Sequence, residues 1–184
     1  MPEAIIEPDL PIIDPHHHLW DRRPVMHLIP PPVHGIDHIS YRKGHYLLDQ
    51  LLEDTGSGHN IVATVYLECR SMYRAGGPDE MKPVGETEFV NGVAAMAASG
   101  LYGKTLACAG IVSTAELLLG AEVGRVLDAH AAAGGARFKG IRRSTSYDAD
   151  PDVLGPLNRN PAGVLMEPKF REGFAELGKR GLSF

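Results

Sequence analysis

Residues 11–20 read PIIDPHHHLW, so an apolar pair at the end of a short buried strand is followed at once by an acid and three histidines. Side chains alternate in direction along an extended chain. We therefore expect His16 and His18 to point the same way, with Asp14 on their face and His17 pointing away. Imidazole nitrogen is a good ligand for zinc, iron, nickel and related ions. The run predicts half of a metal site, formed by His16 and His18 at a strand end.

Other interpretations of the histidine run remain open. A remnant of a purification tag is disfavoured, because the histidines lie between a strand and the pair Leu19-Trp20. Histidines that only form hydrogen bonds in the core or at the surface are the second alternative. Within the metal interpretation, Asp14 either orients a histidine or binds the metal directly.

Composition is typical of a globular protein and argues against several partners. The chain has 184 residues, 43% of them hydrophobic and 22% charged, and a formal net charge of −5. A nucleic-acid partner would favour a basic surface, and a membrane span would need a run of about 18 apolar residues. The acidic N-terminal segment does not resemble a secretory signal. Cys69 and Cys108 lie in apolar segments without metal-site spacing, so we expect buried free thiols and a cytoplasmic protein.

Strands and helices are predicted to alternate along a single domain, residues 1–184. Apolar, β-branched runs predict strands, and apolar positions at helical spacing predict helices. The expected strands are 11–15, 61–69, 105–112 and 137–143, with the start of a fifth at 181–184; the expected helices are 46–54, 85–99, 122–132 and 170–179. Two long irregular loops, 21–44 and 148–168, are rich in proline, and loops of such length commonly wall a binding site.

This alternation predicts an α/β fold with a parallel sheet. An open doubly wound sheet would call for a glycine-rich phosphate loop, and neither GxGxxG nor a P-loop motif is present. A (β/α)₈ TIM barrel needs about 250 residues and carries its chemistry at the carboxyl ends of its strands. His16, His18, Glu68 and Arg142 fall at such ends. We therefore expect a TIM-barrel type fold, of which the chain carries about the first four βα units.

An ordered set of segments supports this interpretation by family resemblance. The chain resembles the amidohydrolase-2 group of the amidohydrolase superfamily, the predicted metal-dependent TIM-barrel hydrolases that include lactonases and decarboxylases of aromatic acids. The resemblance runs over residues 11–184 and rests on DxHxHxW at 14–20, VYLEC at 65–69, GETEFVNG at 85–92, AAMAASG at 94–100, AGIV at 109–112, FKGIR at 138–142, FREGF at 170–174 and GLSF at 181–184. It implies that His16 and His18 are metal ligands. A further histidine and a late aspartate would follow residue 184. Many relatives carry histidine where this chain has Arg143.

The remaining polar residues at strand ends have two interpretations each. Glu68 is either a site carboxylate or an ion-pair partner of Arg70 or Arg142. Arg142 suits a substrate carboxylate, which a guanidinium binds through two parallel hydrogen bonds, or forms a structural ion pair. Lys139 is not expected to bridge metals, because its spacing points it away from Arg142. Trp20 and Tyr73 either wall a pocket or pack, and the loop histidines (His27, His34, His38 and His45) are expected to be solvated.

The expected function is metal-assisted hydrolysis of an ester, lactone or amide carbonyl in a small acidic or sugar-derived substrate. A divalent metal, zinc or alternatively manganese or iron, would lower the pKa of bound water toward 7 and polarise the carbonyl. Arg142, Glu68 and Asp14 are the expected catalytic residues. Four strands leave open edges, which a homo-oligomer would cover. The alternatives are a non-catalytic half-barrel with an incomplete metal site and a nonoxidative decarboxylase.

Overall fold

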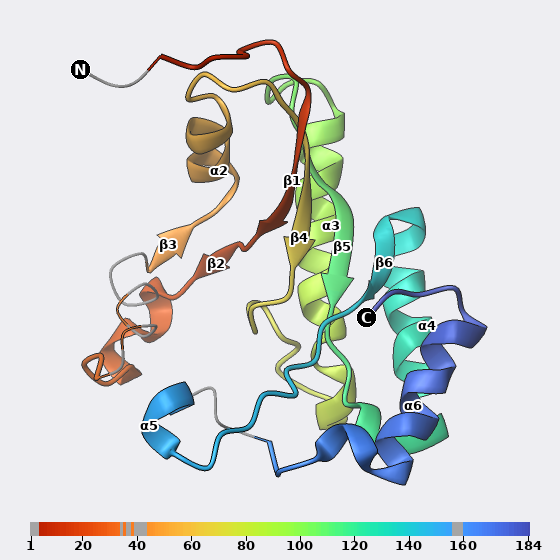
Figure 1. Ribbon diagram of the computed structural model, residues 1–184. Coiled ribbons are helices and arrows are strands. Elements are labelled where there is room, and N and C mark those ends of the chain that lie inside the picture. The colour runs from red at the N-terminus through yellow and green to blue at the C-terminus, as the bar shows by residue number, and fades with distance from the viewer. Residues whose placement is uncertain (1–3, 34, 36–37, 39–43, 156–159) are drawn as a thin grey trace.

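A four-stranded parallel sheet organises the computed structural model, which describes residues 4–33, 35, 38, 44–155 and 160–184 (Figure 1). The strands stand in the order β1-β4-β5-β6, the same as their order along the chain. Their bounds are β1 Ile12–His17, β4 Ile61–Leu67, β5 Leu106–Ser113 and β6 Phe138–Ile141. The predicted α/β class with a parallel sheet is confirmed.

The end of the chain begins to pair with β6 as a fifth parallel strand. Gly140 and Ser183 form an isolated parallel bridge, in which Ser183 N donates to Lys139 O (2.9 Å) and Ile141 N donates to Ser183 O (3.1 Å). Of the expected fifth strand at 181–184, the structure therefore contains a single bridge. Each new strand is added next to the previous one, without the reversal of order that defines a doubly wound sheet.

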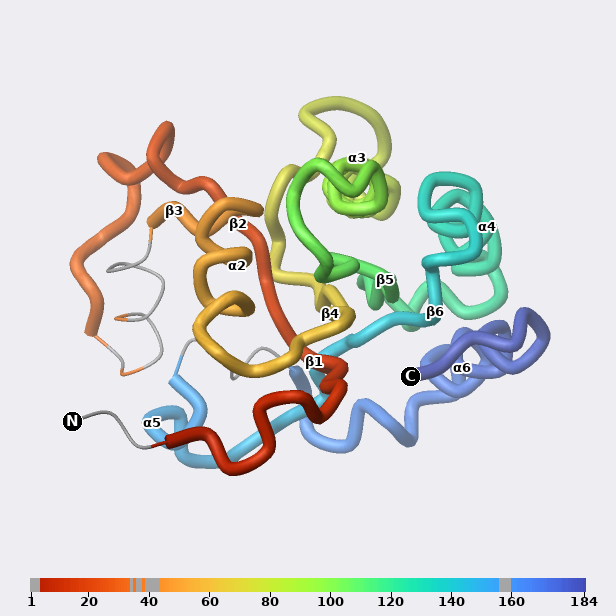
Figure 2. The backbone as a smooth tube through the Cα atoms, turned by 90° about the horizontal axis from the view of Figure 1, so that it is seen from above, coloured from red at the N-terminus to blue at the C-terminus, as the bar shows by residue number. Residues whose placement is uncertain are grey.

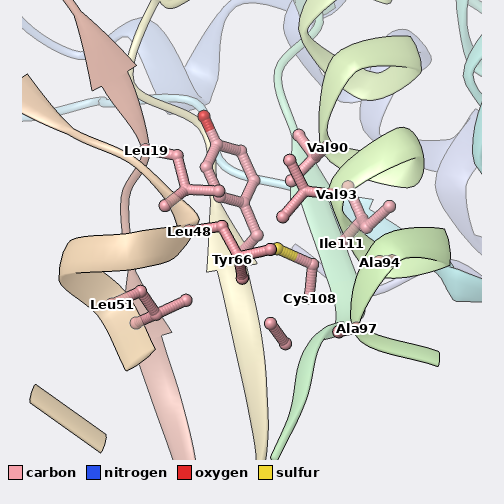
Figure 3. Packing of buried hydrophobic residues seen from close by; sticks show 11 residues of the cluster. Leu19, Leu48, Leu51, Tyr66, Val90, Val93, Ala94, Ala97, Cys108 and Ile111 are labelled. Atoms are coloured by element: carbon pink, nitrogen blue, oxygen red, sulfur yellow. The ribbon is translucent and has the colours of Figure 1, made fainter. Parts of the chain in front are cut away.

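The main helices cover one side of the sheet. Seen along the strands, the sheet is an arc with the helices around its outer side (Figure 2). These helices are α2 Leu48–Thr55, α3 Val84–Ala98, α4 Val123–Gly134 and α6 Pro168–Lys179. Their apolar stripes bury two clusters. One joins α2 and α3 to β4 and β5 around Tyr66 and Leu51 (Figure 3), and the other joins α4 and α6 to β6 around Leu127 and Ile141.

The inner, concave face of the sheet is apolar but open to solvent in the part of the chain that the structure describes. Ile13 is 60% exposed and Leu106 is 50% exposed, and strand pairing places both in register with Ala63. Lys139 lies on the same face, because a side chain at Gly110 would meet both Val65 and Lys139. The opposite, convex face carries the buried Tyr66. Exposed apolar side chains that gather on one face commonly mark a contact surface.

The loops contain more regular structure than expected. The segment after β1 forms a short hairpin, β2 Trp20–Asp21 with β3 His45–Tyr46, around the 3-10 turn η1 Arg23–Leu28. The segment 148–168 contains α5 Pro151–Leu154 and η6 Val164–Met166. Further 3-10 turns are η2 Asp79–Met81, η3 Leu117–Glu122 and η4 Gly135–Arg137. The rest of both loops, including His34, lies partly outside the described residues. No described helix has the length and apolar character needed to cross a bilayer.

Candidate metal and substrate site

A bulge in β1 sets the direction of the three histidines. Asp14 pairs with Thr64 and His17 pairs with Tyr66, so β1 takes three steps while β4 takes two. An extra residue of this kind bends a strand and re-aims its side chains. Asp14 and His17 consequently share the convex side with Thr64. The expectation that Asp14 lies on the face of His16 and His18 is wrong, because the bulge reverses the alternation between positions 14 and 16.

His16 and His18 converge on one point at the carboxyl end of the sheet. Their Nε2 atoms lie 3.1 Å apart, and their rings meet edge to face with centroids 4.8 Å apart. Two nitrogen ligands at 2.0–2.1 Å from a tetrahedral metal ion are separated by about 3.3 Å. The pair is thus already close to the separation that one ion requires, and the expected common direction of these two side chains is confirmed.

A backbone carbonyl fixes the orientation of the His18 ring. His18 Nδ1 lies 2.8 Å from Leu67 O, at the end of β4. A carbonyl oxygen only accepts hydrogen bonds, so Nδ1 carries the proton and Nε2 has a free lone pair in the neutral ring. This is the tautomer that binds metals through Nε2. With this His18 tautomer, the 3.1 Å contact has His16 Nε2–H donating to the His18 lone pair.

The surroundings of His18 favour its neutral form. Burial lowers the pKa of His18, and the nearby positive charges of Arg142 and His16 lower it further, while the Leu67 hydrogen bond raises it. A neutral imidazole is the form that binds a metal ion. Burial therefore favours the neutral, metal-binding form of the His18 ring.

His17 has a structural position, as its opposite direction predicted. Its ring is buried, its Nε2 lies 2.9 Å from the Thr64 hydroxyl, and its Nδ1 has no hydrogen-bond partner in the described structure. Burial lowers the pKa of His17 to about 4. Cys108 packs beside it, and both cysteines are free thiols, although Cys69 is only half-buried. Burial raises the pKa of each thiol to about 12, so neither is a thiolate at neutral pH.

Asp14 supports the backbone of the histidine run. Its Oδ1 accepts a hydrogen bond from the backbone N–H of His16 (3.0 Å), a local turn that stabilises the bulge. The carbonyl of Leu67, and not Asp14, orients a ring in this structure. Sequence reasoning missed Leu67 because a backbone carbonyl leaves no signal in the residue types.

Glu68 and Arg142 form an ion pair across the strand ends. Arg142 Nε donates to Glu68 Oε1 (3.0 Å), and Arg142 Nη2 donates to the backbone oxygen of Glu68 (2.5 Å). Glu68 and Arg142 are therefore ion-pair partners of each other, which is one of the two interpretations expected for each. Arg143 instead contacts Glu116 and Asn160, which ties the end of β6 to η3 and to the second loop.

A cavity of about 470 Å³ adjoins the histidine pair. Trp20 forms one wall, stacked on His18 with ring centroids 5.9 Å apart, and Tyr46 and Asp54 form another, joined by a 2.6 Å hydrogen bond from the Tyr46 hydroxyl. Its lining residues are Asp14, His16, His17, His18, Trp20, Tyr46, Leu51, Asp54, Thr55 and Ile61. Trp20 thus walls a pocket, whereas Tyr73 and the described loop histidines lie outside this lining.

The described residues supply two converging ligands and no larger set. Across residues 4–33, 35, 38, 44–155 and 160–184, no group of three histidine, cysteine or acidic side chains is arranged to hold a metal ion. Further ligands would have to come from water, from substrate or from chain outside this part.

Comparison with known proteins identifies a relative without a described function. The chain is 33% identical over 181 residues to the uncharacterized protein y4mH of Sinorhizobium fredii. The match covers 96% of this chain and 53% of that protein, so the chain spans about half the length of the curated relative it matches. No family model matches the chain, and no solved structure matches it.

Proposed function

We propose that this chain is the N-terminal half of an amidohydrolase-2 type barrel that hydrolyses an ester or lactone carbonyl with the help of a divalent metal. The observation that carries the proposal is the convergence of His16 Nε2 and His18 Nε2 at 3.1 Å, with His18 held in the metal-binding tautomer by Leu67 O. Family resemblance over residues 11–184 supplies the reaction class.

The residues present fit a metal ion of the zinc, manganese or iron type. Two imidazoles close to tetrahedral separation, one of them with its Nδ1 held by a backbone carbonyl, are donors that such ions prefer. When bound, the ion would supply Lewis-acid activation of water and of a carbonyl oxygen. Two protein ligands are too few for a tight site, so the remaining ligands are proposed to lie in the other half of the barrel.

The order of the strands and the position of the helices support closure of the sheet into a barrel. Strands are added in chain order, helices lie on the outer side, and the inner face carries exposed apolar residues such as Ile13 and Leu106. A TIM barrel fills its interior with such side chains and places its site at the carboxyl ends of its strands, where the histidine pair lies.

The other polar residues at this end have positioning roles in the proposal. Arg142 clamps Glu68 through its side chain and its backbone oxygen, which fixes the end of β4 next to Leu67. The positive charge of Arg142 also keeps His18 neutral. The substrate carboxylate that Arg142 was expected to bind would have to compete with Glu68.

A second candidate is a metal-binding half-barrel without activity. It is favoured by the limit of two converging ligands in the described residues. A nonoxidative decarboxylase would use the same ligands, and the choice of substrate separates it from a hydrolase.

Metal content and hydrolysis of a simple lactone, measured together, test the proposal. We expect the purified 184-residue chain to bind zinc weakly, approaching one equivalent only in excess zinc, and His16→Asn and His18→Asn each to abolish that uptake. His45→Asn is the matched control, because His45 lies on the hairpin outside the cavity lining. Zinc uptake with metal-dependent lactone hydrolysis supports the enzyme, and zinc uptake without hydrolysis favours the inactive half-barrel. Zinc uptake that both histidine substitutions leave unchanged contradicts the proposed site.

A further inference from the structure

Trp20 separates the histidine cavity from a second cavity of about 420 Å³. The second cavity lies between the segment that follows β1 and the loop that follows β4. Its lining residues are Trp20, Asp21, Arg22, Val25, Ile29, Cys69, Arg70, Ser71 and Met72. Trp20 lines both cavities, so they adjoin each other at this residue.

The second cavity has an unbalanced positive charge. Two of its lining residues are arginines, Arg22 and Arg70, and neither forms an ion pair with a carboxylate in the described ranges. Asp21 is the acidic residue of the lining, and Arg23 neutralises it through hydrogen bonds of 2.8 and 2.6 Å. These bonds lower the pKa of Asp21 to about 2. An anion entering the cavity therefore meets two guanidinium groups and no free carboxylate of the lining.

The Arg22 guanidinium and the backbone around Arg70 are each held by their surroundings. The Arg22 guanidinium lies 5.3 Å from the centroid of the Trp20 ring, a cation–π contact that keeps it on the shared wall. Arg70 lies between Cys69 and Ser71, whose backbone N–H groups both donate to Glu86 Oε1, at 3.0 and 2.8 Å. The buried carboxylate of Glu86 thus anchors the loop on either side of Arg70.

Two non-glycine residues of this loop have a left-handed backbone conformation. Arg70 and Met72 adopt φ values of 64° and 54°, a region that non-glycine residues rarely occupy. Such strain is retained where surrounding contacts over-determine it, and Glu86 supplies those contacts. In this conformation the loop contributes Arg70 to the cavity lining.

The remaining wall is apolar, formed by Trp20, Val25, Ile29 and Met72. Ligand cavities typically combine an apolar lining with a few placed polar groups that fix orientation. We propose that this cavity binds the anionic group, a carboxylate or a phosphate, of a small organic ligand whose apolar part lies against Trp20. That this ligand is the substrate of the histidine site rests on the proposed function.

Fluorescence of Trp20, the single tryptophan of the chain, reports binding directly. Titration with cyclohexanecarboxylate is expected to give a saturable change. Cyclohexanecarboxamide, which has the same shape without the charge, is expected to bind about tenfold more weakly or worse. Inorganic phosphate is the parallel probe, and saturable binding of phosphate would show that the cavity also accepts a phosphate group.

Substitution assigns the binding to the two arginines. Arg70→Gln and Arg22→Gln are each expected to weaken anion binding by about tenfold, because each removes charge-assisted hydrogen bonds. Arg74→Gln is the matched control, since Arg74 follows on the same loop, pairs with Glu88 and is outside the lining. Equal binding of the acid and the amide, no saturable change with either anion, or an equal loss in Arg74→Gln would overturn the proposal.

Zinc uptake by the same samples keeps the two proposals distinguishable. Arg70→Gln is expected to leave zinc uptake unchanged, because its side chain is outside the histidine cavity lining. Anion binding without zinc uptake would remove the proposed function and leave the anion site. Zinc uptake without anion binding would do the reverse.

Discussion

The hydrogen bond between His18 Nδ1 and Leu67 O decides which ring nitrogen is free to bind a metal. Sequence reasoning predicted the two ligand residues and their common direction from the HxH spacing alone. It could not predict the carbonyl partner, because that depends on where β4 ends beside β1. It also misplaced Asp14, because a β-bulge leaves no clear signal in the residue types.

Asp14 provides a prediction at this scale. Asp14→Asn keeps an oxygen that accepts from His16 N, so we expect zinc affinity to change by less than about threefold. Asp14→Ala removes the acceptor and is expected to cost about 1 kcal/mol of stability. Zinc titration and chemical denaturation of both variants measure this. A loss of zinc binding in the well-folded Asp14→Asn variant would instead make Asp14 a metal ligand.

His130 makes the free energy of unfolding depend on pH, and it does so away from the candidate metal site. It is fully buried, Nε2 donates to Thr114 O (3.0 Å) and Nδ1 accepts from the Thr87 hydroxyl (2.8 Å). Burial lowers the pKa of His130 from 6.5 to about 4. Between these values the unfolded chain binds the proton and the folded chain does not. Neutral His130 therefore contributes its full stabilisation above pH 6.5. The free energy of unfolding falls as the pH drops toward 4, by on the order of 3 kcal/mol.

The variant His130→Gln tests this contribution, because glutamine is polar but does not titrate. We expect its unfolding free energy to fall less steeply than that of the wild type between pH 6.5 and 4.5, in urea titrations at several pH values. Parallel pH profiles for the two proteins would show that His130 is not the group responsible.

At the scale of elements, the loop after β4 is fixed by one residue of α3. Glu86 is 1% exposed, and its Oε1 accepts from Tyr66 OH, Cys69 N and Ser71 N. Burial raises the pKa of Glu86, while these three hydrogen bonds lower it. The sequence placed Glu86 in a helix, but nothing in the pattern predicted that its side chain would reach under the neighbouring loop.

Glu86→Ala is expected to destabilise the fold by about 3 kcal/mol or more, because it leaves several buried donors without an acceptor. Glu86→Gln keeps an acceptor oxygen in nearly the same place, so its cost is expected to be about 1 kcal/mol. Thermal or urea denaturation compares the two. A Glu86→Ala variant as stable as the glutamine variant would mean that the loop does not depend on this carboxylate.

The core elements follow the sequence pattern closely. The predicted strand 61–69 forms β4, Ile61–Leu67, and the predicted helix 85–99 forms α3, Val84–Ala98. Continuous apolar runs and helical spacing are strong signals because burial decides both. The loops were less predictable. Short elements such as η1 and α5 depend on local proline and capping contacts, including the Asp150 side chain that accepts from Asp152 N.

At the scale of the whole molecule, the sheet has one covered face and one open face. The parallel order of strands and the outer helices were predictable from the alternation of patterns. Whether the arc closes depends on contacts that these residues do not contain. The open concave face is therefore the surface on which the fold proposal can be tested.

We expect the 184-residue chain to self-associate through this face. Ile13→Lys places a charge on it, which should weaken association by about tenfold or more, because the charge would have to be buried. Leu101→Lys is the control, because Leu101 is 85% exposed in the turn between α3 and β5. Sedimentation over a wide concentration range measures both variants. A wild-type chain that stays monomeric throughout would contradict association through the sheet.

The most direct test of the histidine pair is long-range ¹H–¹⁵N NMR of the labelled histidine rings, before and after one equivalent of zinc. We expect His18 to carry its proton on Nδ1 before zinc is added, and zinc to shift the Nε2 resonances of His16 and His18 together while those of His17 stay in place. A metal-free His18 with its proton on Nε2, or zinc-induced shifts that leave both of these rings untouched, would contradict the proposed metal site at His16 and His18.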